Sequence, residues 1–283
     1  MKRSFCSLYA GFALAFLSVS GFSTSVHARQ AEQSCGLDQP CQVKSGDYRL
    51  RMPDGVKPGQ KVGAILYFHG FNGNAEGVLN FNALKRVTDE LGVALIAPDG
   101  LYRSWSFPGG PRQRRDELAF IDDVLNDAMK RFAIDRSRIM VSGFSIGGTM
   151  AWNLACYRGS QFAGFAPIAG TLWEPLPISC PSPVPNIIHV HGTSDKTFPL
   201  TGRWIRGQWK QGDIREMFKR VYKQGQCSAE PPRTIREGRL TCERRSHCGS
   251  RIVEFCKHSG GHSVRPVWVA RAWRLLSDRL KWN

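Results

Sequence analysis

The chain has 283 residues, of which 42% are hydrophobic and 22% charged, so it is long enough to bury a full core and too apolar for a disordered chain. Its 29 glycines and 16 prolines are too few for a collagen-like protein. Lys and Arg number 39 against 23 Asp and Glu, which leaves a formal net charge of +16. The length fits one large domain or two small ones.

The first residues resemble a targeting segment. Lys2 and Arg3 precede an apolar run over residues 8–19, and Val-His-Ala ends at Ala28 as a small-x-small cleavage site. We predict that residues 1–28 are a signal peptide. A membrane anchor is the weaker alternative, because the run is shorter than the roughly 20 residues of a span. We therefore expect a secreted or periplasmic protein without a membrane span, whose charge falls to +14 with Lys2 and Arg3 removed.

Eight cysteines remain after residue 28, and an even count in an exported protein predicts four disulfides. Spacing favours a bridge between Cys35 and Cys41, then one between Cys156 and Cys180, with two more among the last four. No C-x2-C pair is present, so we expect no metal site. The candidates are Cys35, Cys41, Cys156, Cys180, Cys227, Cys242, Cys248 and Cys256.

Strand and helix patterns alternate along the rest of the chain. Short apolar runs predict strands at residues 48–52, 62–68, 93–97, 138–142, 163–168, 186–190 and 251–256. Helical spacing predicts helices at residues 75–91, 116–132, 146–157, 213–224 and 265–281. This alternation predicts an α/β fold with a mostly parallel central sheet and helices on both faces. Without a repeat or long linker, we expect residues 29–283 to form a single domain.

The strongest chemical motif is Gly-Phe-Ser-Ile-Gly at residues 143–147, between a predicted strand and a predicted helix. That context is typical of a nucleophile elbow, in which small flanking residues permit a turn so tight that the serine stands exposed. We predict Ser145 as a nucleophile, with the helix N-terminus at Ile146 directed at developing negative charge. The alternative is a plain glycine loop.

A serine needs a base, and the expected chain order is serine, acid, histidine. His262 follows two glycines in a loop and is the best candidate, with His258 as the runner-up. Asp195 comes directly after a predicted central strand, where an acid could hold the histidine. Asp213 precedes a helical pattern and looks like an N-cap.

Such a site also needs an oxyanion hole, and two further histidines lie on a predicted strand nearby in the sequence. We expect the backbone N–H groups of Phe71 and Ile146 to be the oxyanion donors, since Gly70 allows a close backbone approach after the strand at 62–68. His189 and His191 lie two apart on one strand face. We expect them to be packed and hydrogen-bonded, with a metal pair as the less favoured alternative.

Five segments together resemble a known family. They are LYFHGFNGNAEG, IAPDG, FAIDRSRIMVSGFSIGGTMAWNLAC, HVHGTSDKTFP and SGGHS. Over roughly residues 46–280 the chain resembles the secreted α/β-hydrolase esterases that are grouped with polyhydroxybutyrate depolymerases and feruloyl esterases. The resemblance implies Ser145 as nucleophile, Asp195 as acid and His262 as base. It also implies ester hydrolysis without a metal or organic cofactor.

The chain departs from the family pattern at two places that concern specificity. Many members carry Ala or Asn where Ile146 follows the serine, and often Trp-Pro soon after the histidine, where this chain has Ser263-Val264-Arg265-Pro266. Polymer-degrading relatives usually add a substrate-binding domain, and this chain ends at Asn283. We therefore expect a small or oligomeric ester as substrate. Trp105, Trp173 and Phe198 follow strand ends and are candidate substrate-binding residues, although packing is an equally good explanation.

Two other functions stay open. The same triad cleaves amides, so a serine peptidase is one alternative. The positive charge allows a non-catalytic basic protein, or weak adsorption of the enzyme to anionic surfaces. No nucleic-acid motif accompanies the basic clusters, so we expect no nucleic-acid partner. Those clusters are Arg112, Arg114 and Arg115, and Arg233, Arg236, Arg239, Arg244 and Arg245.

Overall fold

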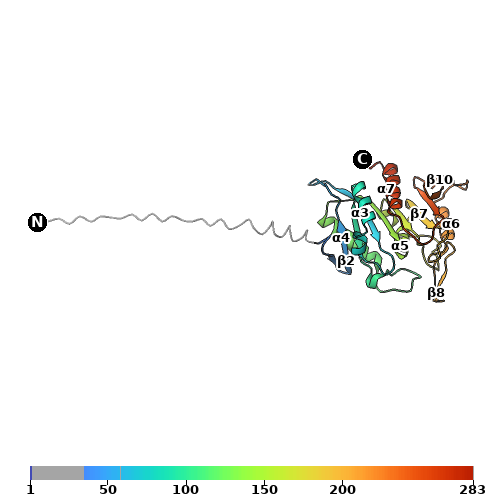
Figure 1. The fold of residues 1–283 in the computed structure, drawn as a ribbon, viewed down its shortest axis with the longest axis horizontal. Coiled ribbons are helices and arrows are strands. Elements are labelled where there is room, and N and C mark those ends of the chain that lie inside the picture. Colours follow the sequence, from blue (N-terminus) through green and yellow to red (C-terminus); the bar gives the residue numbers. More distant parts are fainter. Residues whose placement is uncertain (2–34, 58, 283) are drawn as a thin grey trace.

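A ten-stranded sheet runs through the computed structural model, which describes Met1 and residues 35–57 and 59–282 (Figure 1). Apart from Met1, the predicted signal peptide lies outside the described residues. The order of the strands is β1-β2-β4-β3-β5-β6-β7-β12-β11-β10. They are β1 (Cys41–Val43), β2 (Gly46–Arg51), β3 (Val62–Phe68), β4 (Ala94–Pro98), β5 (Ile134–Phe144), β6 (Gly164–Ile168), β7 (Ile187–Gly192), β10 (Arg233–Glu237), β11 (Leu240–Arg244) and β12 (Val253–His258).

The six neighbouring strands from β4 to β12 are parallel, and the antiparallel strands lie outside them on both sides. This confirms the predicted mostly parallel sheet. Because parallel strands end at one edge, the loops after β3, β5, β7 and β12 meet there. Those four loops, together with Ile146 at the start of α5, contain all the residues predicted for catalysis and for the oxyanion hole.

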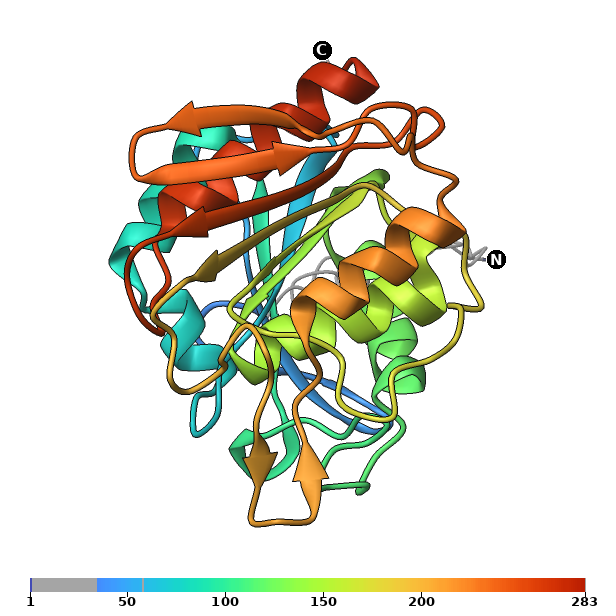
Figure 2. The same ribbon diagram turned by 90° about the vertical axis from the view of Figure 1, so that its right-hand side faces the viewer.

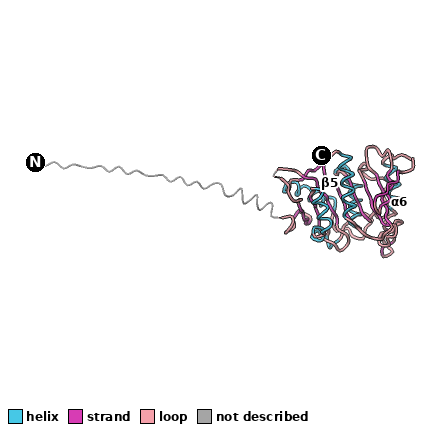
Figure 3. Tube along the Cα trace, turned by 45° about the horizontal axis from the view of Figure 1, so that its top comes forward, coloured by secondary structure: helices cyan, strands magenta, loops and turns pink. Residues whose placement is uncertain are grey.

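Helices cover both faces of the sheet, as predicted (Figures 2 and 3). They are α2 (Ala75–Leu79), α3 (Asn82–Leu91), α4 (Glu117–Arg131), α5 (Ile146–Arg158), α6 (Ile214–Gln224) and α7 (Pro266–Leu280). Successive side chains of β3 point to opposite faces. Leu66 and Phe68 pack in the cluster that contains α4, α5 and α6, whereas Ile65 and Tyr67 pack with α2, α3 and α7. Among the described helices, none is long and apolar enough to cross a membrane.

Two of the helices start at aspartates that cap them. The Asp116 carboxylate caps α4 by accepting hydrogen bonds from the N–H groups of Leu118 and Ala119, at 3.0 and 3.1 Å. Asp213 caps α6 in the same way, through the N–H of Arg215 at 2.8 Å. Asp213 is therefore the N-cap that the sequence indicated.

Two predictions about the elements were wrong. The helix expected over residues 75–91 is broken into α2 and α3, because Phe81 has a non-helical ψ of 87°. The sequence also predicted no strands between α6 and β12, where β10 and β11 form a hairpin on the edge of the sheet. The exposed β10 is rich in charged residues, which is common for edge strands and hides the apolar pattern used to recognise strands.

Four disulfides join the eight cysteines after residue 28, as predicted. Cys35–Cys41 and Cys156–Cys180 are both formed. The last four cysteines form Cys227–Cys248 and Cys242–Cys256, the latter directly across the β11–β12 pair.

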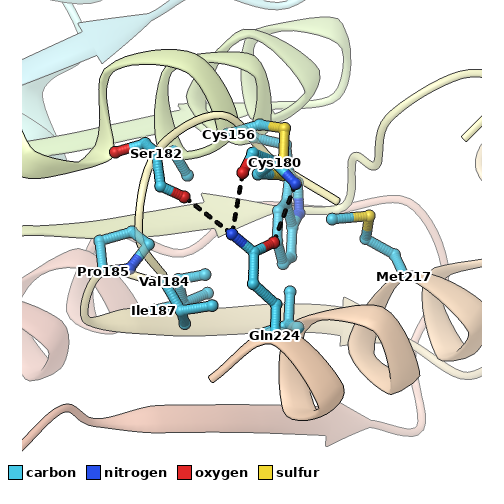
Figure 4. Close-up of a pocket in the computed structure, with 11 residues that line it drawn as sticks. Cys156, Cys180, Ser182, Val184, Pro185, Ile187, Met217 and Gln224 are labelled. Atoms are coloured by element: carbon cyan, nitrogen blue, oxygen red, sulfur yellow. Dashed lines mark hydrogen bonds between the residues drawn. A yellow bond between two sulfur atoms is a disulfide. The ribbon is translucent and has the colours of Figure 1, made fainter. Parts of the chain in front are cut away.

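The Cys156–Cys180 bridge borders a small pocket between α5 and α6 (Figure 4). Gln224 closes this pocket: its side-chain amide donates to the carbonyl oxygens of Cys180 and Ser182 at 2.9 and 3.0 Å, and its Oε1 accepts from the N–H of Cys180 at 2.8 Å. The volume is about 10 Å³, enough for one water molecule at most. The pocket is therefore too small for an organic ligand.

Alkylation tests the disulfides directly. In unreduced, denatured protein comprising residues 29–283, a thiol reagent should label no cysteine, because every sulfur is bridged. After reduction the same reagent should label all eight, counted by intact mass. Labelling of two or more thiols before reduction would show that at least one bridge is absent.

Candidate active site

A single residue, Ser145, joins β5 to α5. It has φ 60° and ψ −124°, a conformation that non-glycine residues rarely adopt. The turn is tight because Gly143 and Gly147 carry no side chain. A Cβ added to Gly143 would lie 2.4 Å from the Gly147 carbonyl oxygen, and one added to Gly147 would lie 2.1 Å from that of Phe68. This geometry has the features expected of a nucleophile elbow.

The loop after β3 passes beside Ser145. A Cβ built on Gly70 would lie 3.6 Å from the Cβ of Ser145. The next residue, Phe71, and the first residue of α5, Ile146, are the predicted oxyanion donors. Within the described ranges, no hydrogen bond uses either of these two N–H groups. Neither N–H group is therefore committed to another acceptor among the described residues.

His69 fixes the shape of this loop. The N–H of Gly100 donates to His69 Nε2 at 3.0 Å, so the imidazole proton lies on Nδ1 and is donated to the carbonyl oxygen of Gly70 at 2.8 Å. Burial lowers the pKa of His69, which keeps the ring neutral. Trp105 is 1% exposed and donates its indole N–H to the His69 carbonyl oxygen at 2.9 Å.

A hydrogen bond joins the side chains of Asp195 and His262 directly. His262 Nδ1 donates to Asp195 Oδ2 at 2.7 Å, while Asp195 Oδ1 accepts from the N–H groups of Thr197 and Phe198, both at 2.8 Å. Burial alone would raise the pKa of Asp195, but the hydrogen bonds from His262 and Phe198 outweigh it and hold that pKa below its ordinary value. An ionised Asp195 keeps the proton of neutral His262 on Nδ1, which leaves Nε2 free to accept one.

Aromatic rings place His262 beside the elbow. Its ring centroid lies 4.5 Å from that of Phe144, the residue before Ser145. On another side, the ring of Phe198 stacks with it at an interplanar angle of 13° and a centroid distance of 6.2 Å. The imidazole is thus confined between Phe144, next to Ser145, and Phe198. Phe198 lies in the loop after β7 that carries Asp195, which we call the acid loop.

The runner-up base, His258, is placed differently. It ends β12, is 7% exposed, and its Nδ1 accepts a hydrogen bond from the N–H of Gly260 at 3.1 Å. Its ring packs against Trp268 at 4.7 Å. Burial lowers the pKa of His258. The direct carboxylate partner found at His262 favours His262 as the base.

The predicted substrate-binding aromatics are largely buried. Trp173 is 5% exposed and packs between Phe107 and Phe198, with ring centroids 5.5 and 6.3 Å away, and Phe198 itself is 1% exposed. Trp173 forms a β-bridge with Gln211. Trp173 Nε1 and Gln211 Oε1 are buried without a hydrogen-bond partner among the described residues, which is unusual for buried polar atoms. Sequence reasoning did not single out Gln211.

One group of potential metal ligands lies in the described part of the chain, away from this site. It consists of Cys242, Glu254 and Cys256. Both sulfurs belong to one disulfide, and the Glu254 carboxylate binds Arg244 and Arg271 at 2.6 and 2.5 Å. We therefore assign a structural role to this cluster.

A family model described as "Putative esterase" matches residues 45–224. The chain belongs to this family. It is a carboxylic ester hydrolase, in agreement with its relatives. Feruloyl esterase C of Emericella nidulans is 26% identical over 195 residues, which cover 66% of this chain and 68% of the relative.

Solved esterase structures share the fold. The feruloyl esterase module from Clostridium thermocellum, solved as a mutant complexed with sinapinate, has a TM-score of 0.55 at 12% identity and covers 84% of each chain. A thermostable esterase has a TM-score of 0.52 at 17% identity, with 83% of this chain and 58% of that chain covered. The expected α/β-hydrolase fold is confirmed by this structural similarity.

The esterase also contains a buried chain of hydrogen bonds behind the acid loop. Trp152 Nε1 donates to His189 Nδ1 at 3.2 Å, so His189 Nε2 carries the proton and donates to His191 Nδ1 at 2.9 Å. His191 Nε2 then donates to the Phe198 carbonyl oxygen at 2.7 Å. The two histidines are packed and hydrogen-bonded, as expected, and they support the segment that donates two N–H groups to Asp195.

The buried hydrogen bonds through His189 and His191 lead us to predict that the protein is less stable in acid. Burial lowers the pKa values of both His189 and His191, so the folded protein keeps these side chains neutral. In the unfolded chain the same histidines have the ordinary pKa of 6.5 and bind protons below that pH. The free energy of unfolding should therefore decrease as the pH falls below 6.5, and be fully recovered above it. Urea denaturation at about pH 7.5 and about pH 5 measures this difference.

Two variants assign the effect. His189→Gln cannot titrate and should lose less stability between the two pH values than the wild type does. His247→Gln removes a histidine that is exposed and should behave as the wild type does. An equal pH dependence in all three proteins would contradict the assignment.

Proposed function

We propose that this esterase hydrolyses carboxylic esters through an acyl-enzyme on Ser145. His262 takes the serine proton and later gives it to the leaving alcohol, Asp195 holds the imidazole, and the N–H groups of Phe71 and Ile146 stabilise the oxyanion. Water then attacks the acyl group with His262 again as base. The 2.7 Å bond from His262 to Asp195 carries the proposal, since that imidazole packs against the residue before Ser145. The mechanism requires no metal or organic cofactor.

The substrate class we propose is a small or oligomeric ester. The names of the relatives support an aromatic acyl ester, because several are feruloyl esterases. Hydrolysis of hydroxybutyrate oligomers, expected from the sequence resemblance, is a further activity to assay. Trp173 and Phe198 are proposed to form the packed wall behind the substrate, since both rings are buried.

We also propose that the protein is exported, with residues 1–28 removed and residues 29–283 forming one catalytic domain. The basic, apolar and small-residue order of the first 28 residues supports a signal peptide. The four disulfides support an oxidising compartment. Weak adsorption to anionic surfaces remains part of this proposal, on the strength of the net charge.

Replacement of the serine tests the mechanism. The Ser145→Ala variant should lose at least about a thousandfold in kcat on p-nitrophenyl acetate and on methyl ferulate, because the acyl-enzyme cannot form. Its circular dichroism and melting temperature should match those of the wild type. Turnover within tenfold of the wild type would exclude Ser145 as nucleophile, and a peptide-cleaving protein inactive on every ester would favour the peptidase alternative.

The two candidate bases can be separated in the same assay. His262→Ala should lower kcat/KM by about a thousandfold or more, since the serine would have no base. His258→Ala should remain active, because His258 has no direct bond to Asp195. The reverse result would transfer the role of base to His258.

A further inference from the structure

Arginines and exposed aromatic rings gather on the oxyanion side of the proposed site. The side chains of Phe71 and Tyr102 are 56% and 72% exposed, respectively. The Arg112 guanidinium lies 5.5 Å from the Phe71 ring centroid, and that of Arg114 lies 4.4 Å from the Tyr102 ring centroid. We call this group, together with Arg103, the arginine rim.

The rim is attached to the loop that would hold the oxyanion. Phe71 supplies both a proposed oxyanion donor and a ring of the rim. The neighbouring Asn72 donates its N–H to the carbonyl oxygen of Arg103 at 2.9 Å, and Arg112 donates to that of Tyr102 at 3.4 Å. The first bond connects the loop after β3 to the loop after β4, and the second lies within the loop after β4. A group bound at the rim would therefore be adjacent to an ester at Ser145.

The three rim arginines have no carboxylate partner in the part of the chain that the structure describes. Across the residues that the structure describes, no ion pair within 4.0 Å includes Arg103, Arg112 or Arg114. The nearby acids are engaged elsewhere. Asp99 accepts the N–H of Ala75, and Asp116 caps α4.

Cation–π contacts prepare two of these arginines, Arg112 and Arg114, for an anion. A guanidinium held over an aromatic ring can direct edge N–H groups at both oxygens of a carboxylate. Because the ring contact orders the side chain beforehand, less conformational entropy is lost when the anion binds. A lysine would supply the charge without this paired geometry.

We propose that the arginine rim binds a carboxylate carried by the substrate, so that the preferred substrates are esters with a negatively charged group near the scissile bond. This inference rests on the proposed function at Ser145. The position of the rim favours a substrate over an anionic surface, since its charges are gathered at one loop junction next to the site. The other exposed basic group, which includes Arg233 and Arg236, lies on the β10 edge at the opposite end of the molecule (Figure 2).

Two matched substrate pairs measure the preference. In the first, 4-acetoxybenzoate and 4-acetoxybenzamide differ by a carboxylate on the alcohol side. In the second, p-nitrophenyl hemisuccinate and p-nitrophenyl butyrate differ by a carboxylate on the acyl side. The readout is the ratio of kcat/KM for the anionic ester to that for the neutral ester, and the pair that responds identifies the side that faces the rim.

The Arg112→Gln/Arg114→Gln double variant should lower this ratio by about three- to tenfold in at least one pair, the size expected for two exposed ion pairs. Comparing each variant with the wild type cancels the intrinsic reactivity of the esters. Added salt should lower the wild-type ratio in the same pair. Arg112→Lys/Arg114→Lys keeps the charge and should retain more of the preference than the glutamine variant does.

The matched control is Arg233→Gln/Arg236→Gln, which removes the same charge far from the site and should keep the wild-type ratio. If neither pair responds to the rim variants, or if the control lowers the ratio equally, the proposal is wrong. Calorimetric binding of both substrate pairs to the Ser145→Ala variant needs no turnover. Tighter, Arg112-dependent binding of the anionic member of either pair would support the rim even if the proposed hydrolysis failed, and equal binding of the two members in both pairs would overturn it.

Discussion

The close approach of α5 to β3 is the constraint on which the rest of the site depends. Gly147 lies so near the Phe68 carbonyl oxygen that no side chain fits, and Ser145, two residues earlier, makes the turn with a positive φ. The same contact brings the end of β3, and the loop that follows it, beside the first N–H groups of the helix. A larger residue at position 147 would separate these two elements and disturb the serine and both proposed oxyanion donors together.

The acid loop is held in another way, by a network of hydrogen bonds from neutral buried groups. Asp195 receives two backbone N–H groups and one imidazole N–H, so its charge is satisfied without an arginine or lysine. His191 holds the Phe198 carbonyl oxygen from behind, and His189 and Trp152 continue the chain into the core. A positively charged partner at Asp195 would compete with the developing imidazolium for the carboxylate, whereas neutral donors leave that interaction to His262.

Much of this arrangement can be predicted from local sequence, because it depends on local rules. The apolar run at 62–68 coincides with β3, Asp213 is an N-cap, and the cysteine spacing indicated the first two bridges. The β10–β11 hairpin could not be predicted, because β10 is stabilised by pairing with β11 rather than by a buried apolar face. The directions of the hydrogen bonds through His189 and His191 also depend on Trp152 and Phe198, which only the tertiary fold brings to those rings.

The distribution of arginine partners separates the structural charges from those proposed to bind the substrate. Arg115 and Arg271 are buried and are paired with Glu117 and Glu254, since an unpaired buried charge would be costly. The rim arginines are arranged in the opposite way: Arg112 and Arg114 lie over aromatic rings, and none of the three has an acidic partner among the described residues. An exposed charge without a partner costs little stability, so a surplus of arginine can be tolerated at the surface. What makes the rim different from that general surplus is its order: each of two guanidinium groups is held over a ring, at the loop that also carries a proposed oxyanion donor.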